Sequence, residues 1–211
     1  MSHNWRISEL FQWLDADALL KLKDYGDALE KWTGKINLIS PKSVKDLDII
    51  HFSDAIMGSR FFLKDLRVNQ ELFDLGSGNG IPGLVLSILR PDLPICCVDS
   101  DQRKIAFIRQ MSLNLNLKNL RTLNFRVEDL PKDSIAVATA RGFSSLKNTL
   151  SQFNDVFSSG SVVYHYKGQD FARELLEIPN AGAKWSSSVV GEYNLPFDSG
   201  RRAIIKSTWA C

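Results

Sequence analysis

The first third of the chain carries apolar residues at helical spacing. In the earliest stretch they recur at alternating intervals of four and three, namely Ala18, Leu22, Tyr25, Leu29 and Trp32. Residues at these intervals share one helix face, so the pattern predicts an amphipathic helix. Thr33-Gly34 and then Ser40-Pro41 mark its end.

A second helical stretch is predicted from about Ser43 to Leu63. Its apolar positions are Val44, Leu47, Ile50, Ala55 and Phe62. The two stretches predict a small helical N-terminal extension over residues 1–66, which serves as a packing subdomain. A second domain is expected over residues 67–211.

From Glu71 onward, short apolar runs alternate with helical segments. The expected strands are Glu71–Leu75, Pro94–Asp99, Thr122–Val127, Ile135–Ala140, Ser161–Tyr166, Lys184–Tyr193 and Arg202–Thr208. The expected helices are Gly83–Leu89, Gln102–Leu115 and Leu146–Phe157. Strands that alternate with helices indicate an α/β fold with a parallel sheet covered on both faces. A long turn joins the last two strands, which predicts an antiparallel edge pair on an otherwise parallel seven-stranded sheet.

Composition narrows the classes of protein. The 211 residues are 44% hydrophobic, which suits one or two compact domains. Lysine and arginine number 26 against 24 aspartates and glutamates, a net charge of +2. This balance excludes a strongly basic nucleic-acid-binding coat, although not a local basic patch. No apolar run approaches the ~20 residues that span a bilayer, and the first residues lack the apolar stretch of a signal peptide. We therefore expect a soluble cytoplasmic protein without a membrane partner.

The cysteines and histidines suggest neither disulfides nor a metal. Cys96 and Cys97 are adjacent in an apolar run, and Cys211 is the last residue. Without a spaced framework, structural disulfides are not expected. The 3 histidines lie far from one another and from the cysteines, so no zinc site is expected.

The most informative stretch is the glycine loop Asp74–Gly83, with the sequence DLGSGNGIPG. The alternate glycines Gly76, Gly78 and Gly80 follow a predicted buried strand and let the backbone approach a ligand without Cβ clashes. Asp99 ends the next strand, near the ~20-residue offset expected of an acid that binds a ribose. The loop therefore predicts a nucleoside-containing cofactor.

Loops of this kind bind dinucleotides or S-adenosylmethionine. Gly78, Gly80 and Gly83 satisfy G-x-G-x-x-G, which alone is a weak signal. Counted from Gly76, the glycine that directly follows the strand, the third glycine of the dinucleotide fingerprint is replaced by Ile81. A carboxylate at Asp74 would repel a pyrophosphate and attract the ammonium group of a methionine moiety. The pattern favours S-adenosylmethionine.

Several motifs in order resemble those of the bacterial small-subunit ribosomal RNA guanine-N7 methyltransferases, the glucose-inhibited division protein B family. They span roughly residues 20 to 206. They comprise Lys31-Trp32, Ile36-Asn37-Leu38, His51 with Asp54, the glycine loop, Arg90-Pro91, Asp99-Ser100, Arg126-Val127-Glu128, Ala140-Arg141, Lys167-Gly168 and Arg201. The resemblance implies a Rossmann-like class I methyltransferase with S-adenosylmethionine as cofactor and ribosomal RNA or the small ribosomal subunit as partner. We expect a monomer.

The resemblance also implies roles for individual residues. Those expected to bind the cofactor are Asp74, Gly76, Gly78, Gly80, Ile81, Asp99, Ser100, Val127, Glu128 and Arg141. Val127 and Glu128 would lie beside the adenine. Arg141 would lie near the transferred methyl group as a catalytic residue that positions the reactants, and Lys167 and Arg201 would bind RNA. The chain departs from the family pattern at Ala55, Gly142 and Gly200-Arg201-Arg202, which bears on substrate contacts more than on the cofactor.

The residues also restrict the methyl acceptor. Methylation at carbon 5 of a pyrimidine needs a cysteine nucleophile, and no cysteine is well placed. Methylation of an exocyclic amine usually uses an Asn/Asp-Pro-Pro-aromatic turn after the fourth strand, where this chain has Ala140-Arg141-Gly142-Phe143. A ring nitrogen such as guanine N7 is an exposed acceptor and needs neither nucleophile nor base.

Several alternatives remain open at this stage. Arg141 has an alternative as an ordinary strand-end ion pair, Lys167 as a solvated lysine, and Phe143 as a core residue rather than a ring that stacks on a base. His51 and Asp54 share a helix face, either near the cofactor loop or as a structural pair. The chain could also be a methyltransferase for a protein or small molecule, or a non-catalytic ribosome-assembly factor.

Overall fold

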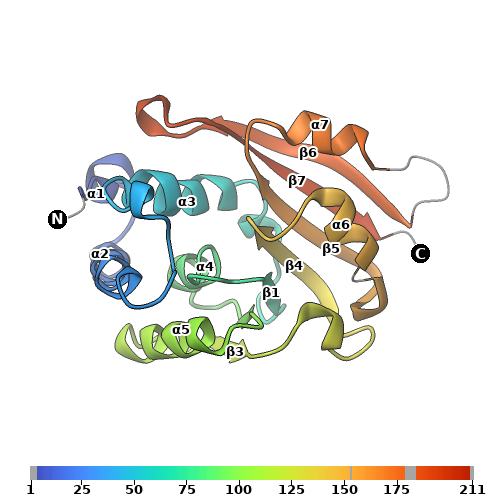
Figure 1. The fold of residues 1–211 in the computed structure, drawn as a ribbon, viewed down its shortest axis with the longest axis horizontal. Coiled ribbons are helices and arrows are strands. Elements are labelled where there is room, and N and C mark those ends of the chain that lie inside the picture. The colour runs from blue at the N-terminus through green and yellow to red at the C-terminus, as the bar shows by residue number, and fades with distance from the viewer. Residues whose placement is uncertain (1–3, 153, 179–183, 210–211) are drawn as a thin grey trace.

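The computed structural model describes residues 4–152, 154–178 and 184–209. In this part of the chain, seven strands form one sheet in the order β3-β2-β1-β4-β5-β7-β6 (Figure 1). The strands are β1 (Leu72–Leu75), β2 (Ile95–Val98), β3 (Leu120–Leu123), β4 (Ile135–Arg141), β5 (Phe157–Lys167), β6 (Trp185–Asn194) and β7 (Arg201–Trp209). The pairs among β1 to β5 are parallel, whereas β7 is antiparallel to both β5 and β6. The predicted parallel sheet with an antiparallel edge pair is confirmed.

Helices cover both faces of this sheet. The α-helices are α1 (Ile7–Leu10), α2 (Ala16–Thr33), α3 (Asp54–Ser59), α4 (Gly83–Leu89), α5 (Gln102–Asn114), α6 (Leu146–Gln152) and α7 (Phe171–Leu176). Shorter turns are the 3₁₀ segments Pro41–Ser43, Leu63–Asp65, Val127–Asp129, Asn154–Val156 and Pro196–Asp198 and the π-helical turn η2 (Asp48–Ser53). Figure 1 shows α3, α4 and α5 on one side of the sheet and α6 and α7 on the other. None of the described helices is long and apolar enough to cross a membrane.

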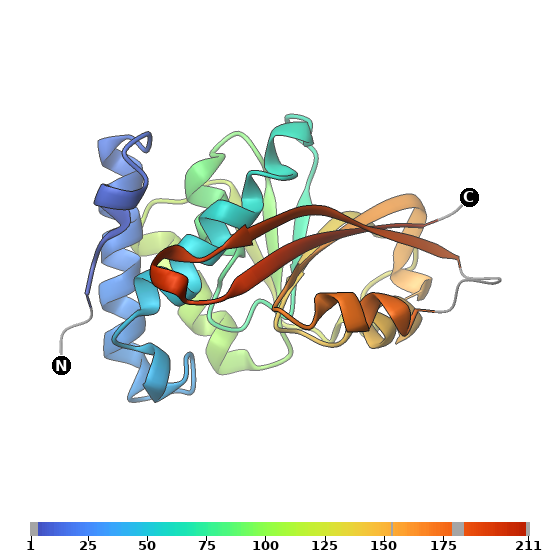
Figure 2. The same ribbon diagram turned by 90° about the horizontal axis from the view of Figure 1, so that it is seen from above.

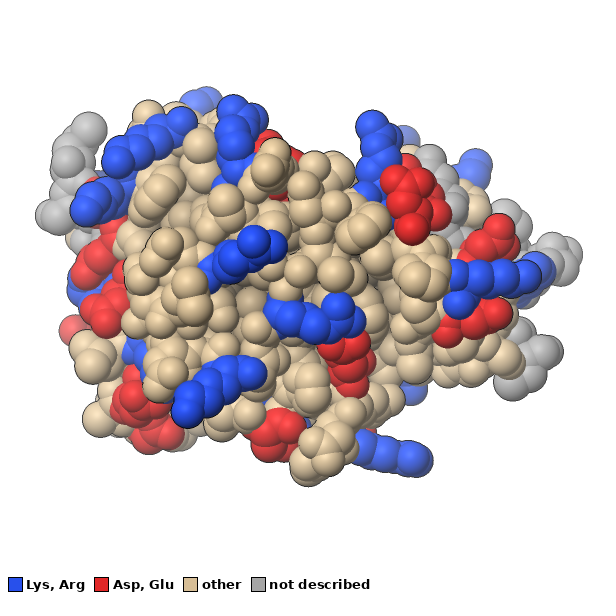
Figure 3. Space-filling model, turned by 90° about the horizontal axis from the view of Figure 1, so that it is seen from below, with Lys and Arg blue, Asp and Glu red and all other residues tan. Residues whose placement is uncertain are grey.

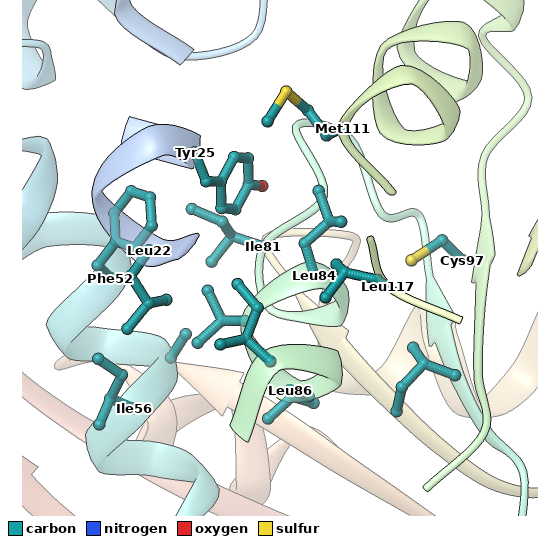
Figure 4. Close-up of a cluster of buried hydrophobic side chains, with 14 of the residues drawn as sticks. Leu22, Tyr25, Phe52, Ile56, Ile81, Leu84, Leu86, Cys97, Met111 and Leu117 are labelled. Atoms are coloured by element: carbon teal, nitrogen blue, oxygen red, sulfur yellow. The ribbon is translucent and has the colours of Figure 1, made fainter. Parts of the chain in front are cut away.

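The larger core joins the N-terminal helices to the sheet. The buried side chains of Leu22 and Tyr25 on α2 share one apolar cluster with Leu84 on α4 and Ile204 on β7 (Figure 4). On the other face of the sheet, α6 and α7 cover the neighbouring β7 residue Ile205. Successive residues of a strand point to opposite faces, so β7 contributes to both cores. A domain boundary near residue 66 stays a prediction.

The second helical stretch is not one regular helix. Between Ser43 and Leu63 the chain forms the π-helical turn η2 and then α3. In the π turn, the side chain of Ser53 donates to the carbonyl oxygen of Asp48, while the carbonyl oxygen of Ile50 accepts from a distant arginine. The spacing of apolar residues predicted that this segment is helical. It does not show that side chains bind the backbone carbonyl groups of Asp48 and Ile50 and change the helix type. Such π turns frequently occur at functional sites.

Two other boundaries differ from the prediction. The third strand is β3, which ends at Leu123, because Asn124 turns away and donates to the carbonyl oxygens of Asp99 and Ser100. The third predicted helix ends at Gln152 as α6, and β5 already begins at Phe157.

The β6–β7 hairpin is the longest arm of the fold. Figure 2 shows it extending over α3, with its tip beside the N-terminal helices. At that tip the Phe197 ring lies 5.2 Å from the guanidinium of Arg6, which in turn binds Asp46 and Asp48. The hairpin therefore connects the edge of the sheet to the N-terminal extension.

Candidate functional site

A cavity of about 1070 Å³ opens at the carboxyl ends of the parallel strands. Ligands of open α/β sheets bind at this edge. Its wall is formed by segments that follow five strands and by the tip of the hairpin, including residues 76–79, 98–100, 125–128, 141–144, 166–170 and 199–200. His51, Asp54 and Arg202 complete the wall on one side.

The glycine loop forms the floor of this cavity. Gly76, Gly78 and Gly80 all have positive φ, at 65°, 57° and 90°. A Cβ on Gly76 would lie 2.1 Å from the ring of Phe143, whereas a Cβ on Gly78 would meet nothing nearer than a carbonyl oxygen at 3.7 Å. Gly76 therefore makes room for a side chain of the protein, while Gly78 leaves its backbone open to the cavity.

Asp99 joins the glycine loop to the second strand. Its Oδ2 accepts from the Gly78 amide at 2.8 Å, and its Oδ1 accepts from the Asp101 amide at 2.8 Å. A carboxylate oxygen accepts more than one hydrogen bond, so both oxygens keep capacity for ribose hydroxyls. Asp99 and Ser100 both line the cavity, as the sequence predicts.

Asp74 lies beneath the loop rather than in the cavity wall. It is 1% exposed, and its Oδ2 accepts from the Gly83 amide at 3.0 Å. Its Oδ1 is buried with no hydrogen-bond partner among the described residues. Burial raises the pKa of this carboxyl to about 7. Asp74 thus supports the turn into α4, and its expected contact with an ammonium group stays a prediction.

The residues of this side of the cavity fit S-adenosylmethionine. The open backbone at Gly78 provides a cradle that any Cβ would fill, and Asp99 keeps the acceptor capacity that a ribose requires. Ile81, Val127 and Glu128 also line the cavity, as predicted. The exposed ring of Phe125 stands in the same wall. The sequence analysis missed Phe125 because it placed this residue inside the expected strand Thr122–Val127.

On the opposite side, Arg141 is held by three acceptors. Its Nε donates to Asp54 Oδ2 at 2.8 Å, and its Nη2 donates to the Ile50 carbonyl at 3.1 Å and to His51 Nδ1 at 2.9 Å. Leu75 pairs with Ala140, so Arg141, the last residue of β4, lies beside the start of the glycine loop. The structure therefore brings the predicted catalytic arginine to the edge of the cofactor floor.

The hydrogen bonds around Arg141 also determine the tautomer and protonation state of His51. Because Nδ1 accepts from Arg141, the ring proton lies on Nε2, which donates to Ser43 Oγ at 3.1 Å. Ser43 in turn donates to the Ser40 carbonyl at 2.9 Å. Burial and the charges of Arg141 and Arg202 lower the pKa of His51 to about 3. His51 is thus a neutral acceptor that orients Arg141, a role that its spacing from Asp54 left open.

Asp54 is the centre of this network. It is 3% exposed, and its Oδ1 accepts from the Tyr193 hydroxyl at 2.8 Å and lies 3.7 Å from Arg202 Nε. Sequence reasoning missed Tyr193, and it named Arg202 only within a turn that departs from the family pattern. Both residues lie more than a hundred residues from Asp54, so the sequence does not show that they meet it.

The two predicted RNA-binding residues have protein partners. Lys167 Nζ donates to the Ser144 carbonyl at 2.7 Å and to Glu174 Oε2 at 2.8 Å, and its side chain is 10% exposed. Arg201 pairs with Glu192 and lies over the ring of Phe171, outside the cavity wall. Lys167 lines the cavity but is a half-buried, paired lysine, not a solvated one. RNA contacts by either residue stay predictions.

The cysteines are not placed for nucleophilic chemistry. Cys96 and Cys97 are free and buried in β2. Burial raises the pKa of Cys96 to about 12 and that of Cys97 well above its usual value. Cys211 lies outside the described residues. Within the described ranges, no group of three histidine, cysteine or acidic side chains could hold a metal ion.

Solved structures with the same fold include a methyltransferase. A SAM-dependent methyltransferase from Aquifex aeolicus aligns with a TM-score of 0.55 and 14% identity over 80% of this chain and 98% of that chain. The YcgJ protein of Bacillus subtilis aligns with a TM-score of 0.56 and 14% identity over 76% of this chain and 99% of that one. At this identity the likeness establishes the Rossmann-like class I methyltransferase fold alone.

Sequence comparison is more specific. Ribosomal RNA small subunit methyltransferase G 3 of Bdellovibrio bacteriovorus is 34% identical over 96% of this chain and 92% of its own length. Ribosomal RNA small subunit methyltransferase G of Halorhodospira halophila is 31% identical over 83% of this chain and 82% of its own length. Residues 18–204 match the family described as rRNA small subunit methyltransferase G. The chain belongs to this family, as the ordered motifs of its sequence predict.

Proposed function

We propose that this protein transfers the methyl group of S-adenosylmethionine to N7 of a guanine in small-subunit ribosomal RNA. Membership of the family makes the chain a methyltransferase that uses S-adenosylmethionine and acts on ribosomal RNA. Guanine N7 as the acceptor follows from the family resemblance and from the residues of the site. The observation that carries the proposal is a single cavity with the open glycine loop on one side and the anchored Arg141 on the other.

When bound, S-adenosylmethionine supplies a methyl group already activated by the sulfonium. Gly78 and Asp99 hold the nucleoside end of the cofactor. Asp54, His51 and the Ile50 carbonyl fix the guanidinium of Arg141 beside the glycine loop. Guanine N7 would take the methyl group with its own lone pair as the carbon–sulfur bond breaks and S-adenosylhomocysteine leaves; N7 carries no proton, so no residue has to remove one. Catalysis then rests on alignment and fixed charges.

The network around Arg141 agrees with this chemistry. His51 is neutral and its Nδ1 is occupied by Arg141, so it is not a general base in this geometry. A carboxylate that removes a proton from the acceptor is not needed either, and Asp54 is engaged by Arg141 and Tyr193. We further infer a cytoplasmic monomer, because ribosomal RNA is the substrate and the site is built within one chain.

Methyl transfer from labelled cofactor tests the proposal. Small subunits from a strain that lacks this gene should accept label in their RNA, at one guanine that becomes N7-methylated. Label in a ribosomal protein or in a small molecule would support the other class of methyltransferase. RNA binding without transfer would support an assembly factor.

Arg141→Ala tests the assignment of the catalytic residue. We expect the single-turnover rate to fall about a hundredfold, because misplacement at the reacting centre can cost that much, while affinity for RNA changes less. Arg121→Ala is the matched control, since Arg121 also pairs with a carboxylate, Glu71, but lies outside the cavity wall. An unchanged single-turnover rate in Arg141→Ala would contradict the place given to Arg141.

A further inference from the structure

Two guanidinium groups meet at one buried carboxylate in the cavity wall. Arg141 Nε bonds to one oxygen of Asp54, and Arg202 Nε lies 3.7 Å from the other. All three residues line the cavity, and β1 separates the strands of Arg141 and Arg202, β4 and β7, from β2, which Asp99 follows. In the proposed methyl transfer, Asp54 positions Arg141, whereas Arg202 has no assigned role.

Arg202 keeps donors that the protein does not use. Its Nη1 donates to the Arg201 carbonyl at 3.1 Å. Its Nη2 has no acceptor among the described residues, and its side chain is 22% exposed. An arginine has five N–H donors and no acceptor. The unused donors of the Arg202 guanidinium can therefore bind only an acceptor or an anion that enters the cavity.

The surrounding backbone is shaped for this side chain. Gly200 has φ of +120°, and a Cβ there would lie 2.8 Å from Arg202 Nη1. Tyr193, on the partner strand of the hairpin, holds Asp54 through its hydroxyl. The guanidinium is therefore held from two directions before any ligand binds, which lowers the entropy lost on binding.

The charge at this wall favours an anion. Asp54 carries one negative charge between two guanidiniums, which leaves one positive charge in excess. The whole chain has a net charge of only +2, and Figure 3 shows basic and acidic side chains interspersed on the face it presents. Attraction for RNA must therefore come from local groups, and arginine matches the geometry of a phosphate with two parallel N–H bonds.

We propose that Arg202, held by Asp54 and the Arg201 carbonyl, binds a phosphate group of the RNA backbone next to the acceptor base. The inference rests on the proposed function, because it takes RNA as the substrate. It assigns Arg141 to the reacting centre and Arg202 to the backbone of the same nucleotide segment. Arg201, the neighbour that the sequence favours, is on the opposite face of β7 and pairs with Glu192.

Binding of small-subunit RNA across salt concentrations tests this assignment. Arg202→Gln should weaken binding about tenfold to a hundredfold at low salt, as loss of a hydrogen bond to a charged group does. It should also lower the slope of log affinity against log salt by about one. Arg121→Gln, the control outside the cavity, should leave the slope unchanged. A lower slope in Arg201→Gln with a wild-type slope in Arg202→Gln would overturn the inference.

Affinity for S-adenosylmethionine separates phosphate from the other anion that enters this cavity, the carboxylate of the cofactor. Calorimetry should give the same cofactor affinity for Arg202→Gln and the unmodified protein. A large loss of cofactor affinity with an unchanged RNA slope would assign Arg202 to the cofactor and overturn the proposal.

Asp54→Asn distinguishes two effects of Asp54: its positioning of the two guanidinium groups and its negative charge in the cavity wall. The substitution removes a negative charge from the wall, so charge alone predicts tighter RNA binding. If Asp54 positions the guanidiniums, RNA binding weakens and the single-turnover rate falls. Tyr193→Phe makes the same test without a change of charge and should give a smaller loss of RNA affinity. Wild-type RNA affinity in Tyr193→Phe together with tighter binding in Asp54→Asn would overturn the positioning role.

Failure of the inference and failure of the proposed function have different signatures. If the unmodified protein transfers no methyl group to small-subunit RNA, the proposed function fails. If it transfers methyl normally and Arg202→Gln keeps the wild-type salt slope, only the assignment of Arg202 fails.

Discussion

The two sides of the cavity are built in different ways. On the cofactor side, the short glycine loop that follows β1 lines the cavity and is joined to Asp99 through the Gly78 amide. On the acceptor side, side chains from α3, β4, β6 and β7 converge on Asp54. The first side depends on φ angles that glycine adopts easily, and the second on hydrogen bonds between residues far apart in the chain.

This difference implies two kinds of sensitivity. A side chain added to the glycine loop should remove cofactor binding and leave the acceptor side intact. A loss of one hydrogen bond at Asp54 should change positioning and rate while the cofactor still binds. The following substitutions test whether the two sides separate in this way.

Gly78→Val should have the largest effect. Its side chain would occupy the cradle, so we expect affinity for S-adenosylmethionine to fall by more than about a hundredfold, equivalent to the loss of about 3 kcal/mol. Gly160→Val is the control, since Gly160 also has positive φ, at 78°, and open space around its Cβ, but lies outside the cavity wall. Calorimetry should show normal cofactor binding for the control. Equal losses in both variants would mean that backbone strain, not the cradle, is responsible.

Asp99→Ala should have the next largest effect. Loss of one or two hydrogen bonds to a charged acceptor should weaken cofactor binding about tenfold to a hundredfold. The Gly78 amide also loses its partner, which loosens the loop. Asp99→Asn, which keeps the shape and one acceptor oxygen, should give an intermediate affinity in the same titration. Tighter binding of NAD than of S-adenosylmethionine by the unmodified protein would overturn the cofactor assignment itself.

Asp74→Asn tests the buried carboxyl beneath the loop. Burial raises the pKa of Asp74 to about 7 from an ordinary value of 3.8, so the folded protein binds this proton more tightly than the unfolded chain. The stability that the proton contributes is complete below pH 3.8 and is lost as pH rises through 7. Asparagine does not ionise, so the stability of the variant relative to the unmodified protein should rise by about tenfold in the unfolding equilibrium for each pH unit between 3.8 and 7, and should stay level above pH 7.

Urea denaturation from pH 5 to pH 8 measures this difference. Contributions from the histidines are common to both proteins and cancel in the comparison. A stability difference that stays constant over this range would show that Asp74 does not titrate there.

Tyr25→Phe should have the smallest effect and measures how the N-terminal extension supports the cofactor side. The buried Tyr25 hydroxyl donates to the Asn79 carbonyl at 2.6 Å (the ring is shown in Figure 4). Loss of this bond should weaken cofactor binding about fivefold, the equivalent of about 1 kcal/mol. Tyr164→Phe is the control, because no partner of the Tyr164 hydroxyl is recorded among the described residues and its ring is also buried. Unchanged affinity in Tyr25→Phe would show that α2 only packs against the loop.

Sequence predicts most of the fold because its elements carry local signals. Apolar runs and helical spacing located all seven strands and the bounds of α4. The predicted bounds were wrong where a side chain binds backbone groups and interrupts the regular strand or helix. Asn124 binds two carbonyl groups and ends β3 early, and the π turn before α3 follows the contact of Ile50 with Arg141.

In the candidate site, too, the sequence predicts the parts that carry a local signal and misses those that depend on contacts between distant residues. The glycine loop and Asp99 can be recognised because their order along the chain determines their order in space. Arg141 was found through its motif, but Tyr193 and Arg202, which contact its partner Asp54, were not assigned to the site, because only the folded sheet brings β6 and β7 to Asp54. One position along β7 separates Arg201 from Arg202, and the alternation of a strand decides which of them faces the cavity.

The position of the β6–β7 hairpin at one edge of the sheet bears on how such an enzyme can change over time. β6 is bonded to one neighbour only, so its tip can lengthen, shorten or change sequence without rearranging the central strands. That tip carries Ser199 and Gly200 into the cavity wall, while the glycine loop and Asp99 follow β1 and β2. A lineage can therefore alter which RNA segment it accepts while the machinery for the methyl donor is inherited unchanged.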